Sequence, residues 1–190
     1  MYNSLSSLPS VGYNILVYLA TSPKAENLWK MLKYDDYYCL SKPNLTLDEK
    51  LAFIWKTGPQ ENYSVFLSPL VEDAITESKT IIKIYDYYIN KNELYTSAVV
   101  YAFDCLYGGN MALIDWNGVP GSRGDVFIHT IMSTLNGVSV GGVGNMSFAS
   151  DLTRYNIAKA TIGNSKTFTG VQIFMSTLMG DSGIDNNCDD

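Results

Sequence analysis

Apolar side chains recur every three or four positions in the first third of the chain, which is the spacing of one helical face. A first helix is predicted from Val11 onward. Ser22 and Pro23 mark the start of a second, because Ser caps helices and Pro suits the first helical position. The apolar positions on these two faces are Ile15, Leu16, Leu19, Ala25, Leu28, Trp29 and Leu32.

A third helix is predicted to begin at Thr46, because Thr46 and Glu49 have the spacing of a capping box. In this motif each side chain accepts a hydrogen bond from the other residue's free backbone N–H group. Gly58 and Pro59 are expected to end the helix. Its apolar face comprises Leu47, Leu51, Ile54 and Trp55.

The middle of the chain changes to runs that are rich in β-branched and aromatic residues. Residues 80–88 and 95–106 are predicted to be two antiparallel strands, since the polar segment 90–93 suits a hairpin connection between them. Asp104 interrupts the second run, so its carboxylate is expected to be paired or in contact with water. This hairpin is the first part of the expected sheet.

Beyond residue 106, turns and strands surround one further helix. Residues 110–124 are expected to form a turn-rich loop, and residues 125–135 a helix that Asn136 and Gly137 end. The remaining segments are strands at 141–148 and 168–179 and an extended loop at 150–165.

The order of elements is helices, hairpin, helix and strands, and this segregation indicates an α+β protein rather than a doubly wound parallel sheet. The expected fold has N-terminal helices followed by an antiparallel sheet with one packed helix. We predict a flexible Ser-rich arm over residues 1–10, a single α+β domain over 11–180 and a disordered acidic tail over 181–190.

Composition and charge exclude several classes of function. The hydrophobic fraction is 46 % and the net charge is −6, from 13 basic and 19 acidic residues. Direct binding to nucleic acid is not expected, because it needs clustered cations and no cluster occurs. No signal-peptide pattern is present, and no apolar run approaches the roughly 20 residues that span a bilayer, so no membrane partner is expected.

The chain is rich in tyrosine, with 14 residues of this type, while its charged fraction is 17 %. Low charge and many aromatic side chains are typical of the core of a protein–protein interface. The alternative is that these rings pack on the core and leave their hydroxyls in water. The candidate interface residues are Tyr34, Tyr37, Tyr38, Tyr85, Tyr87 and Tyr88.

No arrangement of side chains indicates catalysis, a metal site or a cofactor. His129 is the only histidine and the three cysteines are widely spaced, which argues against a zinc site. The glycine-dense segment 137–144 follows a helix and leads into a strand, whereas a phosphate-binding loop precedes a helix. We therefore expect a protein that is not an enzyme. A deep pocket that gathered His129, Cys105 and Asp104 would favour the opposite conclusion.

Arg123, Gly124 and Asp125 match an adhesion tripeptide, but such short matches arise often by chance. Asp125 lies at the start of a predicted helix, where its carboxylate can satisfy free amides and complement the helix dipole. This local role is the preferred interpretation.

Three groups of segments carry a family resemblance. The first group is Leu28-Trp29-Lys30-Met31-Leu32-Lys33-Tyr34 with residues 42–46 and 50–55. The second group is Val65-Phe66-Leu67-Ser68-Pro69 with residues 73–74 and 80–85. The third group runs from Arg123-Gly124-Asp125-Val126 to Leu135-Asn136-Gly137 and residues 141–144. Together they span residues 25–150. They resemble a family of small structural proteins encoded in the head–tail gene block of tailed bacteriophages.

The resemblance implies a neck, head–tail joining or tail-completion protein with a fold like that of tail terminators. Such proteins form rings around the DNA conduit between the portal and the tail, and some line it with an acidic wall, which the net charge of −6 fits. The implied partners are further copies of the chain and other neck, portal or tail proteins, with DNA only passing through. The implied location is the virion, after synthesis in the host cytoplasm, and no cofactor or catalytic residue is implied. The alternative function is a small non-enzymatic protein-binding module.

Overall fold

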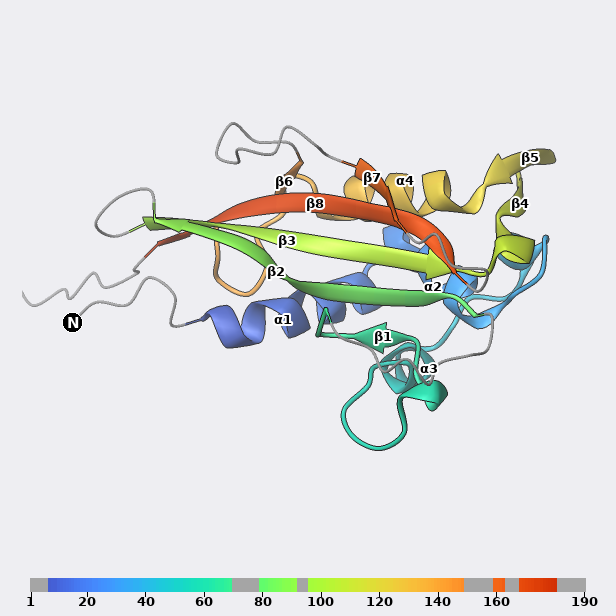
Figure 1. Cartoon of the computed structure of the whole chain (residues 1–190), viewed down its shortest axis with the longest axis horizontal. Helices are drawn as coiled ribbons and strands as arrows, with labels where there is room; N and C mark the ends of the chain where they lie inside the picture. Colours follow the sequence, from blue (N-terminus) through green and yellow to red (C-terminus); the bar gives the residue numbers. More distant parts are fainter. Residues whose placement is uncertain (1–6, 70–78, 92–95, 149–158, 163–167, 181–190) are drawn as a thin grey trace, which may run out of the picture.

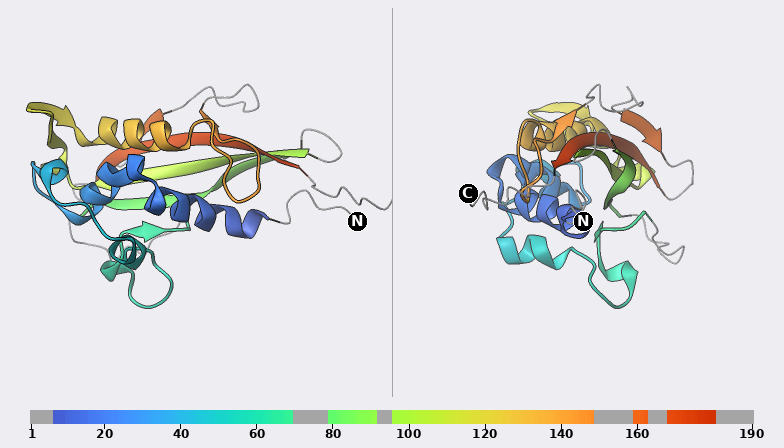
Figure 2. Two further views of the ribbon diagram at one scale, coloured as in Figure 1. Left: turned by 180° about the vertical axis from the view of Figure 1, so that it is seen from behind. Right: turned by 90° about the vertical axis from the view of Figure 1, so that its left-hand side faces the viewer.

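The computed structural model describes five stretches of the chain: residues 7–69, 79–91, 96–148, 159–162 and 168–180. They form two layers, a long twisted sheet and a group of helices that lie against one of its faces (Figure 1). The rear view in Figure 2 shows the helices on that face, and α4 lies next to α2 there. The acidic tail and most of the predicted arm lie outside the described residues.

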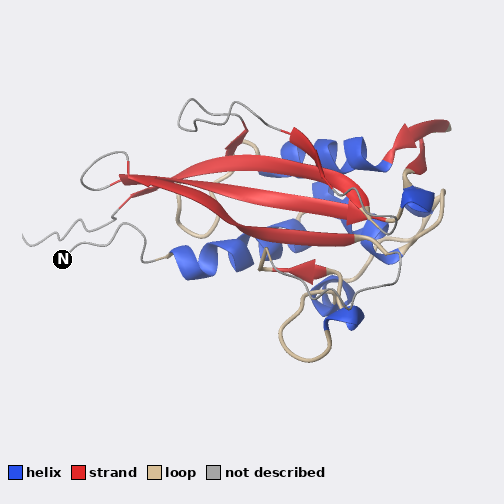
Figure 3. Cartoon of the chain, viewed as in Figure 1, coloured by secondary structure: helices blue, strands red, loops and turns tan. Residues whose placement is uncertain are grey.

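Helices occupy the first third of the chain and one later segment, as the apolar spacing predicts (Figure 3). Their bounds are α1 Leu8–Thr21, α2 Glu26–Lys33, α3 Leu47–Ala52 and α4 Arg123–Leu135, with 3-10 turns at Pro23–Ala25, Cys39–Ser41, Gln60–Asn62 and Gly109–Met111. α1 includes the last three residues of the predicted arm, 8–10. Its proline lies in the first turn, where a missing N–H costs no hydrogen bond.

The sheet confirms the α+β class and the predicted central hairpin. Its strands are β1 Val65–Phe66, β2 Ile81–Lys91, β3 Thr96–Tyr107, β6 Ser147–Phe148, β7 Lys159–Ile162 and β8 Thr169–Gly180. The order is β1-β2-β3-β8-β6, and β7 also pairs with β8. All of these pairings are antiparallel except that of β1 with β2. A bulge between Asp86 and Tyr88 interrupts the register of β2.

Four sequence predictions about elements are wrong in their extent or type. α3 ends at Ala52, six residues before Gly58, because Ile54 leaves the helix and bridges to Val65. Residues 141–148 contain only the short strand β6, since turns occupy 141–143. The predicted loop 150–165 contains β7, and the predicted loop 110–124 contains a hairpin that is described below.

The main core fills the space between the helices and the inner face of the sheet. Alternate residues of β3 face the helices, and Val99, Phe103 and Cys105 are fully buried there. Trp29 of α2 is the largest fully buried side chain, and its indole Nε1 donates to the carbonyl oxygen of Leu19 at 2.9 Å. This bond ties α2 to α1.

The outer face of the sheet carries a paired carboxylate. Asp104 is buried and accepts from Gln172 Nε2 at 2.7 Å and from the Tyr85 hydroxyl at 3.2 Å, while Lys83 Nζ lies 3.0 Å away. Burial first, and then the Asp104 charge, raise the pKa of Tyr85 to about 12. The expectation that Asp104 would be paired is confirmed.

The capping box at α3 leads to a pH-dependent prediction. Glu49 Oε2 accepts from Thr46 N at 2.8 Å, Glu49 N donates to Thr46 Oγ1 at 3.3 Å, and Glu49 Oε1 lies 2.5 Å from Lys33 Nζ. The Lys33 hydrogen bond, followed by those from Thr46, lowers the pKa of Glu49 from 4.5 to about 2. The carboxylate therefore stabilises the fold above pH 4.5, and this contribution disappears as the pH falls toward 2.

We expect Glu49→Gln to lower the urea midpoint at pH 7 and to have little effect near pH 2. Unfolding curves of both proteins across this range measure the difference. Asp48→Asn removes a charge from the same turn without breaking a capping bond, so it serves as the control and should change the midpoint less at pH 7. An equal loss at both pH values for Glu49→Gln would contradict the assignment.

Candidate functional site

A hairpin forms one end of the molecule, where the sequence predicts a loop. β4 Leu113–Trp116 pairs with β5 Val119–Ser122, and Asn117 and Gly118 form the turn with φ of 55° and 85°. Positive φ at both central residues is the geometry of a type I′ turn, which Asn-Gly favours. Figure 1 shows this hairpin projecting beyond the end of the sheet.

Arg123 holds the base of the hairpin to the rest of the fold. Its side chain is fully buried, and each of its five N–H donors has an acceptor. The acceptors are the carbonyl oxygens of Met111 at 2.7 Å, Met31 at 3.0 Å and Asp36 at 3.4 Å, the Thr80 hydroxyl at 3.2 Å and the Cys39 sulfur at 3.9 Å. Burial lowers the pKa of Arg123, and the nearby Cys39 and Asp35 oppose this effect.

This burial also decides between the two interpretations of Arg123-Gly124-Asp125. A receptor cannot reach Arg123 in the folded chain, so the interpretation of this tripeptide as an adhesion motif is excluded. The cap of α4 differs from the prediction as well. Ser122 is the N-cap residue, and its hydroxyl accepts from Asp125 N at 3.4 Å.

Three of the large apolar side chains at this end are more than half exposed. They are Tyr38 at 58 %, Leu113 at 59 % and Val119 at 56 %, and we call them the hairpin-end patch. The backbone N–H of Asp115 donates to the carbonyl oxygen of Tyr37 at 2.8 Å, which places the Tyr37–Tyr38 segment directly beside β4. The β4–β5 register pairs Leu113 with Ser122 and Val119 with Trp116, so Leu113 and Val119 lie on opposite faces of the hairpin. Exposed apolar groups on both faces of a projecting end suit contact with other proteins.

A groove of about 330 Å³ lies between the hairpin and α4. The Trp116 and His129 rings meet edge-on, with 5.6 Å between their centroids. A side chain at Gly121 would approach Trp116 Cβ at 2.9 Å, so glycine lets the indole fold back over its own hairpin. Val119 pairs with Trp116, so the groove lies on the face of the hairpin that carries Val119.

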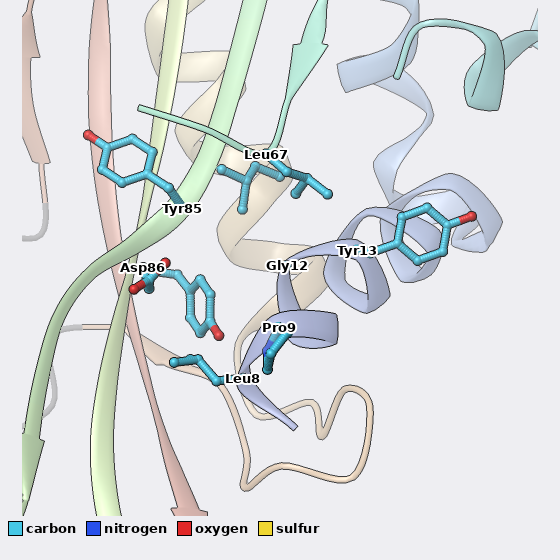
Figure 4. Close-up of a pocket in the computed structure, with 9 residues that line it drawn as sticks. Leu8, Pro9, Gly12, Tyr13, Leu67, Tyr85 and Asp86 are labelled. Carbon is cyan, nitrogen blue, oxygen red and sulfur yellow. The ribbon is translucent and has the colours of Figure 1, made fainter. Parts of the chain in front are cut away.

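A second hollow, of about 210 Å³, lies between α1 and β2 (Figure 4). We call it the α1–β2 groove. Its walls are mostly apolar, and two polar groups, Asp86 and the Tyr101 hydroxyl, belong to its lining. The lining residues used below are Leu8, Pro9, Leu67, Ile84, Asp86 and Tyr101.

The six tyrosines proposed for an interface divide into three groups. Tyr38 and Tyr87 are exposed, and the Tyr87 ring lies 5.0 Å from that of Phe174 on the outer face of the sheet. Tyr85 and Tyr88 are half-buried against the small cluster of Val100, Ala102 and Phe174 on that same face. Tyr34 packs partly on the main core and Tyr37 is half-buried beside Tyr38. The interface assignment of all six stays a prediction.

The side chains that would have indicated catalysis are not brought together. Asp104 and Cys105 are consecutive in β3 and therefore face opposite sides of the sheet. His129 is exposed on α4 beside Trp116. Cys105 is fully buried, and this burial raises the pKa of its thiol well above the ordinary value, which disfavours the reactive thiolate. Within the described stretches, no cluster of three or more His, Cys, Asp or Glu side chains is placed to hold a metal ion.

Comparison with known proteins adds one match. The sequence model of a family described as YomW matches residues 25–177. No curated protein and no solved structure matches the chain. Among the helices that the structure describes, none has the length and apolar character needed to cross a membrane.

Proposed function

Because the chain belongs to the YomW family, which is phage-associated, we propose that it is a structural subunit of a tailed-phage particle. In this proposal, copies of the chain form a ring in the neck or tail, joining the portal or connector to the tail around the DNA conduit, in the manner of a tail terminator. Its partners are further copies and adjacent neck, portal or tail proteins. Its task is geometric rather than catalytic.

The hairpin-end patch is the observation that carries this proposal. An exposed apolar surface on a projecting hairpin is costly for an isolated subunit, because apolar area remains in water. Burial against a neighbouring chain recovers that free energy. A ring requires heterologous contacts, in which one surface of a subunit meets a different surface of the next. A projecting hairpin is suited to such a contact.

The acidic character of the chain fits a subunit that lies near DNA without binding it. A net charge of −6 repels the phosphate backbone, whereas DNA-binding surfaces carry clustered cations. An acidic wall would let DNA pass through the conduit without sticking.

We expect the double variant Leu113→Asp, Val119→Asp to abolish ring formation. Two charges in an interface core lose apolar burial and gain a desolvation cost, so the association constant should fall by roughly 30-fold or more. Light scattering after size-exclusion chromatography and negative-stain imaging measure the outcome. Leu47→Asp is the matched control, because Leu47 is also exposed but lies on α3, away from the hairpin.

Location in the particle tests the proposal independently of self-association. Mass spectrometry of purified virions is expected to detect the chain at a constant copy number per particle, and particle reconstruction to place it between portal and tail. Absence from virions would exclude the structural role. A monomer with one tight protein partner and no place in the particle would favour the alternative, a small non-enzymatic binding module.

A further inference from the structure

The α1–β2 groove combines apolar walls with the Asp86 carboxylate and with the Tyr101 hydroxyl, which has no hydrogen-bond partner. Leu8 and Pro9 at the start of α1 face Leu67 and β2 across the hollow in Figure 4. A slot of this kind accepts an aliphatic stem, because the stem loses contact with water while its walls lose exposed apolar area.

Asp86 and Tyr101 are neighbours on the adjacent strands β2 and β3. Asp86 of β2 lies directly opposite Tyr101 of β3 in the strand register, so the two side chains share one face of the sheet. Tyr101 is only 2 % exposed, and its hydroxyl makes no hydrogen bond. A buried hydroxyl without a partner has lost its hydrogen bonds to water, so a group that paired with it would be held favourably.

Electrostatics selects the kind of group that can enter. Burial and then the Asp86 charge raise the pKa of Tyr101, so the phenol stays protonated and the carboxylate supplies the only negative charge of the pair. An anion would be repelled by Asp86, and a wholly apolar group would leave the Tyr101 hydroxyl unpaired. An ammonium group has three donors, enough to reach the carboxylate and the phenol oxygen together. A lysine side chain combines that head group with an aliphatic stem.

The contacts of the chain's own lysines indicate which of them could supply this ammonium group. Six of those whose side chains the structure describes have acceptors: Lys30, Lys33, Lys42, Lys50, Lys79 and Lys83. Lys24 and Lys56 are exposed and make no hydrogen bond or ion pair within the described chain. Lys56 lies in the segment between α3 and β1, which projects from the body in Figure 1, whereas Lys24 lies in a 3-10 turn that contacts α4.

We propose that the α1–β2 groove is a socket for Lys56 of a neighbouring copy of this chain, whose ammonium pairs with Asp86 and the Tyr101 hydroxyl. The contact is heterologous, because the projecting loop of one subunit meets the groove of the next, as a closed ring requires. This assignment rests on the proposed ring function and adds a second contact to the hairpin-end patch.

Zero-length carbodiimide cross-linking of the assembled wild-type protein tests the contact directly. The reagent joins a carboxylate to an amine only when the two touch. A mixture of unlabelled and ¹⁵N-labelled chains is expected to give cross-linked Asp86–Lys56 peptides in which one peptide is labelled and the other is not. Absence of this peptide from cross-linked rings, or its formation only within one copy, overturns the proposal.

Substitutions test the energetics with an internal control. Asp86→Asn and Lys56→Gln are each expected to weaken self-association about tenfold, and Lys24→Gln to leave it unchanged. The reversed pair Asp86→Lys with Lys56→Asp should recover most of the loss. Tyr101→Phe should also weaken association without lowering the unfolding midpoint of the monomer, because the hydroxyl has no partner there.

The results of these experiments distinguish failure of the Lys56 contact from failure of the proposed ring function. Rings that form equally well from Asp86→Asn protein overturn the socket and leave the ring function standing. Equal effects of Lys56→Gln and Lys24→Gln overturn the choice of lysine. A wild-type chain that stays monomeric and is absent from virions removes both proposals.

Discussion

Replacing Arg123 with methionine is expected to lower the free energy of unfolding by roughly 3–5 kcal/mol. Methionine retains most of the apolar volume but has no donor. The carbonyl oxygens of Met31, Asp36 and Met111 would then remain buried with no N–H from this side chain. Buried ion pairs can often be replaced by apolar groups when both partners change, but backbone carbonyls cannot be removed by substitution.

Chemical denaturation of the purified variant measures this loss, provided that the slope of the transition is unchanged. Lys24→Met is the matched control, because it also converts a cation to methionine but at an exposed position, where changes stay within about 0.5 kcal/mol. Arg123→Lys should be nearly as harmful as Arg123→Met, since an ammonium cannot reproduce the planar fork of donors. A loss below about 1 kcal/mol for Arg123→Met would show that water or relaxed backbone satisfies these carbonyls.

Truncating Trp29 to alanine is the second change with a large expected effect, again roughly 3–5 kcal/mol. Trp29 is the largest side chain with no exposed surface, and its loss would leave a cavity between α1, α2 and the sheet. It would also remove the donor that the Leu19 carbonyl accepts at 2.9 Å. A domain that is stable by about 5–15 kcal/mol would lose a large share of its stability.

Trp55→Ala provides the comparison for the same chemical change at a different depth. Trp55 is half-exposed, and its indole donates to the carbonyl oxygen of Gly58 within one loop. We expect less than half of the Trp29 effect, because less apolar area leaves contact with protein. Urea midpoints of the two variants, measured side by side, show which substitution lowers the stability more. Equal losses would show that the helix layer relaxes to fill the space.

Elements with strong local signals follow directly from the sequence. The capping box of Thr46 and Glu49 forms as its spacing predicts, and Gly137 ends α4 with a φ of +78°. The prediction that β2 and β3 form a hairpin is also confirmed, because long runs of β-branched and aromatic residues have one favourable pairing. These features need only neighbours within a few residues or one uninterrupted pattern.

Short elements with mixed polarity were not predicted. The β4–β5 hairpin has strands of only four residues each, and Asp115 and Pro120 obscure its alternation. Its Asn117-Gly118 turn was a recognisable signal that the interpretation as a loop did not use in full. β7 owes its existence to pairing with β8, which lies later in the chain.

The candidate site also combines features that the sequence predicts with features that only the fold decides. Tyr38 was predicted to contact other proteins and is exposed, but its place next to β4 depends on a backbone hydrogen bond between Asp115 and Tyr37. The sequence assigned no role to Asp86, and nothing in it paired Asp86 with Tyr101. The strand register decides that pairing.

The sequence by itself determined the class of the fold, the types of its longer elements and the absence of a recognisable catalytic pattern. These properties depend on periodicity, capping residues and composition, which act within a few turns of chain. Only the tertiary structure decided that Arg123 is buried and bonds to residues as distant in the sequence as Met31. It also decided that exposed apolar side chains from separate segments lie at one end of the molecule. Such contacts are set by packing over long sequence separations, where many pairings are compatible with the local pattern and only the assembled fold selects one.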